Sequence, residues 1–554
     1  MAPVEVEHLP RDLPLTLAIL RVATAAYVSY TVGRSLYRSH QALRPAQDTR
    51  YRQSERAKLS IAFGGFAALG LAFAISSGLK YLTLSYKVWA SERGVDYPES
   101  LFESRTLTAL GTSRSGLYLR YWLTDTSVYL DALEIIAEKT RRLWWGQQLD
   151  LATISWTALL AIEGRRRRIP HLWAYALLPH LVNLSFAQNL FYVALLQTPS
   201  PIPPEETRIA RALHKIFPRK ANNWFPKPSL LIVPLILNYL ATLWLPWTAG
   251  TSSFPTAVFL TRLLTLAPVM LPNIVPTSWG IVYSDPRDAY PSITKLFRTI
   301  SAMTGLLHVK TTLSALLYNL PGSYKHRHSI KIPLDIEKRS KWERTATAIE
   351  KVLGSMTDHP VVSAAGKDVL LSALTLGIWA AVRSADVGNM LRVAIPFPKS
   401  LQRSSSEEAP TETVKAEEAS TASAHEESPK PATTGMTLRR RGRPKKTSIS
   451  SIASSDMPAE ETQPTPRRRG RPRKAKPEPE PEPEPEQDGL EPEDVPNDKT
   501  YEPTPKVRAE VEMGDIMPQE DFDWEPASLA WGLTVLGGLG AASAAVYGAE
   551  CVSR

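Results

Sequence analysis

The chain has 554 residues, a formal net charge of +10, 46 prolines and 14 tryptophans. Its mean hydropathy of −0.18 averages a strongly apolar part and a polar stretch, which excludes both one soluble core and a uniformly disordered chain. The one cysteine, Cys551, excludes a disulfide within the chain and a thiolate metal cluster. The positive charge fits anionic lipid or nucleic acid as a partner, although Arg and Lys also orient polytopic membrane proteins.

The apolar part, residues 1–395, predicts an all-α fold, a polytopic transmembrane helical bundle. A helix needs about 20 mostly apolar residues to cross a membrane, because every backbone amide must be satisfied without water. A last transmembrane helix is expected within 527–554, for a total of about eight or nine spans. The clearest apolar runs are 59–79, 172–196, 230–249, 257–283 and 528–548.

Four further runs are short or carry internal charges, and they complete the predicted bundle: 13–36, 149–162, 296–320 and 361–382. Trp144 and Trp145 precede the short run as interfacial anchors, and four arginines, 165–168, follow it. The acidic segment 118–137 is expected to lie at the membrane interface.

Charged groups inside spans are costly, so each is a candidate site. The string EGRRRRIPHLWAYALL, which begins two residues after Ala161 at Glu163, resembles multi-pass membrane proteins of filamentous fungi. Such families include membrane-bound terpenoid cyclases, in which buried carboxylic acids protonate the substrate. The resemblance implies an alternative function as an integral-membrane biosynthetic enzyme. Its possible acids are Glu163, Asp150, Asp131 and Asp125.

The residues themselves argue against that chemistry. Four arginines beside Glu163 favour an ionised carboxylate, which is a poor acid. Glu163 and Asp150 lie 13 residues apart, roughly 20 Å along a helix, too far to act as a pair. The polar residues of 171–189 are interpreted as helix-packing groups, and we expect no metal and no cofactor.

Residues 396–526 are rich in Pro, Glu, Ser and Thr, so they cannot bury enough apolar surface to fold. We predict a long intrinsically disordered linker. Within it, 477–486 alternates Pro and Glu, which favours an extended rod of roughly 30 Å.

Two basic strings in this linker, RRRGRPKK at 439–446 and RRRGRPRK at 467–474, resemble AT-hooks, which are short DNA-binding motifs with a Gly-Arg-Pro core. In such a motif, glycine lets the backbone approach the groove floor, proline keeps the chain extended, and the arginines occupy a narrow A·T minor groove. The flanking basic residues contact phosphates. The predicted DNA-binding residues are Arg441, Gly442, Arg443, Pro444, Lys445, Arg469, Gly470, Arg471, Pro472 and Arg473.

Other interpretations of the two strings stay open: a nuclear-import signal, a patch for anionic lipid head groups, or a solvated charge run. The leading hypothesis is a non-enzymatic protein of the endoplasmic reticulum or nuclear envelope that tethers A·T-rich DNA. Its expected partners are membrane lipid and the A·T-rich minor groove, with protein partners unknown. A transporter is ranked last, because no internal repeat is visible.

Topology decides whether the strings can meet DNA. Arg165–Arg168 are expected to face the cytosol, since short cytoplasmic loops are enriched in Arg and Lys. If every apolar run from 172 to 382 crosses, five crossings place the linker in the lumen, away from DNA. If one run fails to cross, the linker is cytosolic, and the charged run 296–320 is the expected exception.

Overall fold

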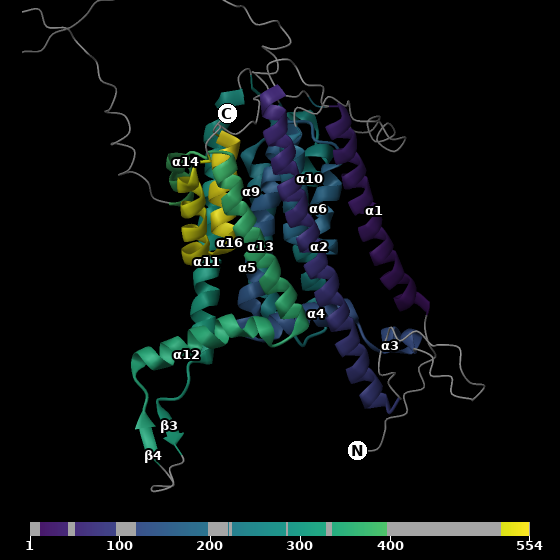
Figure 1. The fold of residues 1–554 in the computed structure, drawn as a ribbon, viewed down its shortest axis with the longest axis vertical. Coiled ribbons are helices and arrows are strands. Elements are labelled where there is room, and N and C mark those ends of the chain that lie inside the picture. Colours follow the sequence, from purple (N-terminus) through teal and green to yellow (C-terminus); the bar gives the residue numbers. More distant parts are fainter. Residues whose placement is uncertain are drawn as a thin grey trace, which may run out of the picture. The chain divides into compact units, whose positions relative to one another are not determined.

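The computed structural model describes residues 12–42, 50–95, 118–197, 220, 224–283, 286–327, 335–395 and 522–552. The chain divides into two compact units, 1–407 with 503–554 and 408–502, and every described residue belongs to the first. In that unit the predicted all-α, polytopic architecture is confirmed (Figure 1), and the described strands form two antiparallel two-stranded sheets.

Among the described residues, seven helices are long and apolar enough to cross a membrane. They are α1 (Asp12–Ala42), α2 (Arg50–Arg93), α9 (Pro228–Thr248), α10 (Phe254–Ile274), α11 (Tyr290–Asn319), α13 (Pro360–Val382) and α16 (Trp524–Val552). Helix α5 (Thr140–Leu159) continues through the π-helical turn η2 (Leu160–Gly164) and also spans the bundle, although its charges lower its hydropathy.

Short elements join these helices. Helices α3 (Leu119–Asp125) and α4 (Val128–Glu138) precede α5, whereas α12 (Lys341–Gly354) and the turn η5 (Ser355–Thr357) precede α13. Strands β1 (Trp224–Pro226) and β2 (Gly280–Val282) pair antiparallel, with Trp224 opposite Val282. Strands β3 (Tyr324–Arg327) and β4 (Asp335–Lys338) also pair antiparallel. The turns η3 (Thr277–Trp279) and η4 (Pro286–Ala289) and helix α14 (Val387–Ala394) complete the described elements.

The predicted single crossing over 172–196 is wrong, because this segment folds into a helical hairpin. Helix α6 (Leu172–Leu181) ends at Val182, whose φ of −120° and ψ of −89° leave the helical region, and α7 (Leu184–Leu196) begins at the N-cap Asn183. The rings of Tyr175 and Phe191 lie 5.4 Å apart. Sixteen residues of continuous helix would separate them by about 24 Å, so α7 runs back along α6.

Contacts with α2 and α13 show where this hairpin turns. Asn183 donates from Nδ2 to the carbonyl of Gly70, in the middle of α2, at 2.8 Å. Tyr192 stacks on Trp379, near the C-terminal end of α13, with ring centroids 4.3 Å apart. The hairpin therefore reaches half-way through the bundle and returns to the end from which it starts. Such a re-entrant segment is tolerated in a membrane only where protein covers its backbone.

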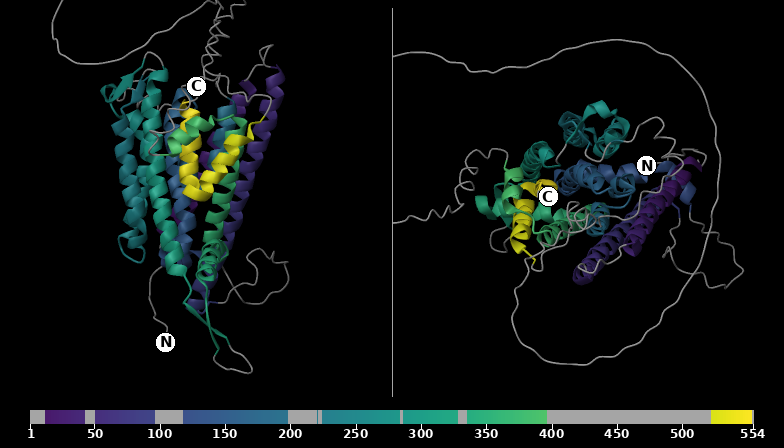
Figure 2. Two further views of the ribbon diagram at one scale, coloured as in Figure 1. Left: turned by 90° about the vertical axis from the view of Figure 1, so that its left-hand side faces the viewer. Right: turned by 90° about the horizontal axis from the view of Figure 1, so that it is seen from above.

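Helix α16 also turns back, at Gly538, whose φ of 76° and ψ of 166° interrupt the helix. Figure 2 shows its two arms (yellow) side by side rather than end to end. Beyond the bend, α16 runs parallel to α5: the amide of Leu539 donates to Gln148 Oε1 at 3.3 Å, and Ser543 Oγ lies 2.5 Å from Ser155 Oγ. The segment predicted as the last crossing thus begins and ends at one end of the bundle.

We call this end the linker end. It holds the C-terminal end of α13 at Val382, both ends of α16, and residues 165–171 (Figures 1 and 2). The opposite end holds α12 and the β3–β4 hairpin (Figure 1).

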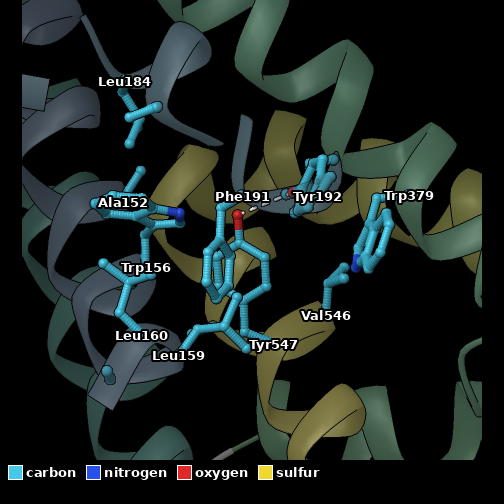
Figure 3. Packing of buried hydrophobic residues seen from close by; sticks show 14 of the residues in the cluster. Ala152, Trp156, Leu159, Leu160, Leu184, Phe191, Tyr192, Trp379, Val546 and Tyr547 are labelled. Carbon is cyan, nitrogen blue, oxygen red and sulfur yellow. Dashed lines mark hydrogen bonds between the residues drawn. The ribbon is translucent and has the colours of Figure 1, made fainter. Parts of the chain in front are cut away.

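The core lies where α5, α7, α13 and α16 meet (Figure 3). Trp156, Phe191, Trp379 and Tyr547 are each at most 1 % exposed, so the α6–α7 hairpin and the bent helix α16 are packed inside the bundle. The hydroxyls of Tyr192 and Tyr547 lie 3.0 Å apart, which joins α7 directly to α16 (Figure 3).

Candidate functional site

The predicted DNA-binding residues of the two strings, 439–446 and 467–474, lie outside the described residues, as does the Pro-Glu segment 477–486. The AT-hook interpretation therefore stays a prediction. The structure does describe the two places where the linker joins the bundle, at Ile395 and at Phe522.

The first attachment is helix α14, which follows α13 directly. Asp386 caps it, accepting hydrogen bonds from the amides of Gly388 at 2.9 Å and Asn389 at 3.3 Å. Its far end is held by α11: Arg298 Nε donates to the carbonyl of Arg392 at 3.2 Å. The chain thus leaves the bundle from a fixed helix at the linker end.

The second attachment is α16, whose last turn is held by buried charges. We call this set of residues the ionic latch: Glu163, Arg166, Arg167, Arg383 and Glu550. Arg383 donates from Nε to Glu550 Oε2 at 2.8 Å and from Nη2 to Oε1 at 2.6 Å, a bidentate pair in which both side chains are 3 % exposed.

The other half of the ionic latch joins α16 to the tetra-arginine string. Glu163 is fully buried, and it contacts Arg166 Nη2 at 2.6 Å and Arg167 Nε at 2.9 Å. Arg167 Nη2 also lies 3.8 Å from Glu550 Oε1, so the two pairs form one network. Removing one partner from such a buried pair costs about 3–5 kcal/mol, because the other charge remains buried and unpaired.

The four carboxylates of the enzyme alternative are not brought together. Glu163 belongs to the ionic latch, and Asp150 accepts from Arg262 Nη1 at 2.7 Å. Asp125 pairs with Arg93 at 2.9 Å, and Asp131 accepts from the hydroxyl of Ser127 at 2.6 Å. Each carboxylate thus has its own hydrogen-bond or ion-pair partner, and the four do not form one site.

Sequence reasoning missed one cluster in the middle of the bundle, around Asp150. Arg262, from the centre of α10, reaches both Asp150 and His180, with Nη1 3.4 Å from His180 Nδ1. Arg21, from α1, donates to the carbonyl of His180 at 3.2 Å and lies 3.8 Å over the ring of Tyr129. An arginine inside each of two apolar runs is the signal that could have pointed to it.

The polar residues of α7 and its N-cap form hydrogen bonds inside the bundle. Asn183 caps α7, and Gln188 Nε2 donates to the Tyr192 hydroxyl at 2.7 Å. Asp368 accepts from the amides of Leu184 and Ser185 at 2.9 and 2.8 Å, which satisfies the free N-terminus of α7 inside the bundle. Within the described ranges, no three His, Cys, Asp or Glu side chains are grouped to hold a metal ion.

No model of a known protein family, no curated protein and no solved structure matches this chain. The contacts and the topology described above are therefore the basis for assigning a function.

Proposed function

We propose that the protein is a non-enzymatic membrane anchor that tethers A·T-rich DNA through the two hook strings of its linker, in the endoplasmic reticulum or nuclear envelope. The observation that carries this proposal is that both ends of the linker join the bundle at the end that also holds Arg165–Arg168. By the enrichment of basic residues in short cytoplasmic loops, that end faces the cytosol, which is continuous with the nucleoplasm.

The number of membrane crossings after Arg165–Arg168 supports a cytosolic location of the linker. The α6–α7 hairpin returns to the linker end, and α9, α10, α11 and α13 then cross, an even number. The sequence had favoured the charged run 296–320 as the segment that does not cross. In the structure, however, α11 runs through the bundle, and the conflict between the tetra-arginine string and the linker is removed by α6–α7 instead.

A second basic segment at the linker end also supports a cytosolic location for that end. The end of α1 and the start of α2 lie at the linker end, where Phe63 packs against Tyr192 and Trp379 with ring centroids 5.3 and 5.6 Å away. Residues 34–58, which comprise the end of α1, the connection and the start of α2, are rich in arginine. Segment 320–359 at the opposite end is also basic and opposes this orientation, so the assignment rests on residues 34–58 together with Arg165–Arg168.

The two fixed attachments suit a tether. A force on the linker would act on α13 and α14 at one end and on α16 at the other, and the ionic latch joins α16 to α5 and α13. The first hook string begins at Arg439, 44 residues after Ile395 in the sequence.

The proposal is tested with the purified full chain in nanodiscs and duplexes of equal length that are A·T-rich or G·C-rich. We expect A·T-preferring binding that Arg441→Ala, Arg443→Ala, Arg469→Ala and Arg471→Ala together abolish. The matched control changes Arg439, Arg440, Arg467 and Arg468 to Ala, which removes the same charge but keeps both Gly-Arg-Pro cores. If both variants weaken binding equally and without base preference, the strings are unspecific charge and the tether proposal fails.

A further inference from the structure

One pair of cations at the linker end belongs neither to the ionic latch nor to the hooks. Arg165 lies with its Cζ 5.1 Å from the centre of the Trp224 indole, and Lys220 lies with its Nζ 4.5 Å from the same ring. Two cations are thus held against one aromatic side chain, whose electron-rich face attracts both.

The indole is a rigid platform for this pair. Trp224 is 4 % exposed, its Nε1 donates to the carbonyl of Thr277 at 2.8 Å, and its strand is paired with β2. Opposite the ring stands Gly280, where any Cβ would overlap the indole. The site is therefore formed before any ligand arrives, since strand pairing and this close approach fix the ring.

The charge of this pair is not compensated by the described residues. Both carboxylate oxygens of Glu163 are taken by Arg166 and Arg167, and neither Arg165 nor Lys220 forms an ion pair in the part of the chain that the structure describes. Lys220 donates to the neutral carbonyl of Pro272. The Nη1 atom of Arg165 is buried and has no hydrogen-bond acceptor among the described residues.

Burial and proximity both disfavour these charges. Burial lowers the pKa of Arg165 to about 10. Burial, and then the neighbouring Arg165, lower the pKa of Lys220. An anion between the two groups would stabilise both positive charges and offer an acceptor to the free donor of Arg165.

We propose that Arg165, Lys220 and Trp224 form a binding site for the phosphate of an anionic phospholipid head group at the linker end. A guanidinium can offer two parallel donors to phosphate oxygens, and an ammonium binds phosphate as a point charge. A lipid is the favoured source because the site lies beside the ends of α9 and α10, where the membrane surface meets the bundle. Anchoring tryptophans are typical of that depth.

The site is tested on the full chain in nanodiscs of phosphatidylcholine with increasing phosphatidic acid or phosphatidylserine, with bound lipid counted by native mass spectrometry. We expect retention of the anionic lipids over phosphatidylcholine. Lys220→Gln alone should weaken retention roughly tenfold, since one charge-assisted contact is lost, and adding Arg165→Gln should remove the preference.

The control Lys338→Gln with Lys341→Gln removes two charges at the opposite end and should leave retention unchanged. The proposal would be overturned if the wild type and the Arg165→Gln/Lys220→Gln variant retained anionic lipid equally while circular dichroism showed both proteins to be folded. Displacement of the lipid by glycerol phosphate at equal concentration would also overturn it, in favour of a soluble phosphate ligand. Lys220→Gln, whose side chain is only partly buried, keeps the test valid if the double variant does not fold.

Discussion

The ionic latch can be tested through the only cysteine of the chain. Cys551 is fully buried and lies next to Glu550, so a maleimide reaches its thiol only when the last turn of α16 opens. Changing Glu550 to Ala leaves Arg383 buried without its bidentate partner, at a cost of about 3–5 kcal/mol. Because 1.4 kcal/mol is a factor of ten, the labelling rate should rise by roughly 10²- to 10³-fold.

Two control variants distinguish loss of the Arg383–Glu550 ion pair from unspecific destabilisation of α16. Arg383→Leu with Glu550→Leu removes both charges together, so its labelling rate should be closer to that of the wild type than to that of Glu550→Ala. Glu525→Ala removes an exposed carboxylate from the other arm of α16 and should not change the rate. Slow labelling of Glu550→Ala, or fast labelling of the double variant, would refute the role given to this pair.

The bend of α16, the start of α7 and the residue that precedes α13 can each be tested by a single substitution. Gly538→Ala should lower the thermal midpoint, because a Cβ at φ 76° is strained and would lie 2.5 Å from His308 Nδ1, whereas Gly532→Ala, which meets no atom, should not. Asp368→Ala should cost about 1–3 kcal/mol of unfolding free energy in a denaturant titration, because two amides of α7 lose their acceptor. Burial lowers the pKa of His359 in the folded protein, so folding favours the neutral imidazole. The neutral imidazole therefore contributes to stability above the ordinary histidine pKa, and this contribution is lost as the pH falls through the pKa of the folded state. The thermal midpoint should therefore fall with acidification below about pH 6.5, and less so in His359→Asn.

The helices could be predicted from the sequence because hydropathy and length are local properties. The hairpins could not, because their turns depend on distant residues. Asn183 is a recognisable N-cap, but α7 can begin inside the bundle only because Asp368, 184 residues later, accepts its free amides. Gly538 is one of several small residues in its apolar run, and nothing local in the sequence marks it as the position with a φ of 76°, where a Cβ would lie 2.5 Å from His308 Nδ1.

Among the charged groups, too, the sequence indicated the local pairs but not the pairs between distant residues. The sequence indicated that Glu163 is paired, since four arginines follow it within one turn and a half of helix. It gave no indication that Glu550 and Arg383 close the same network, because 167 residues separate them. Arg262 was hidden in an apolar run, and only the packing of α10 against α5 brings it to Asp150.

The proposed exit of the linker from the cytosolic end of the bundle is tested by protease protection. One epitope tag is inserted between Ala432 and Ser450 in the linker, and another between residues 328 and 334, beyond β3 at the opposite end. In cells whose plasma membrane alone is permeabilised, added protease should remove the linker tag and spare the other. Protection of the linker tag with loss of the second would contradict both the topology and the DNA tether.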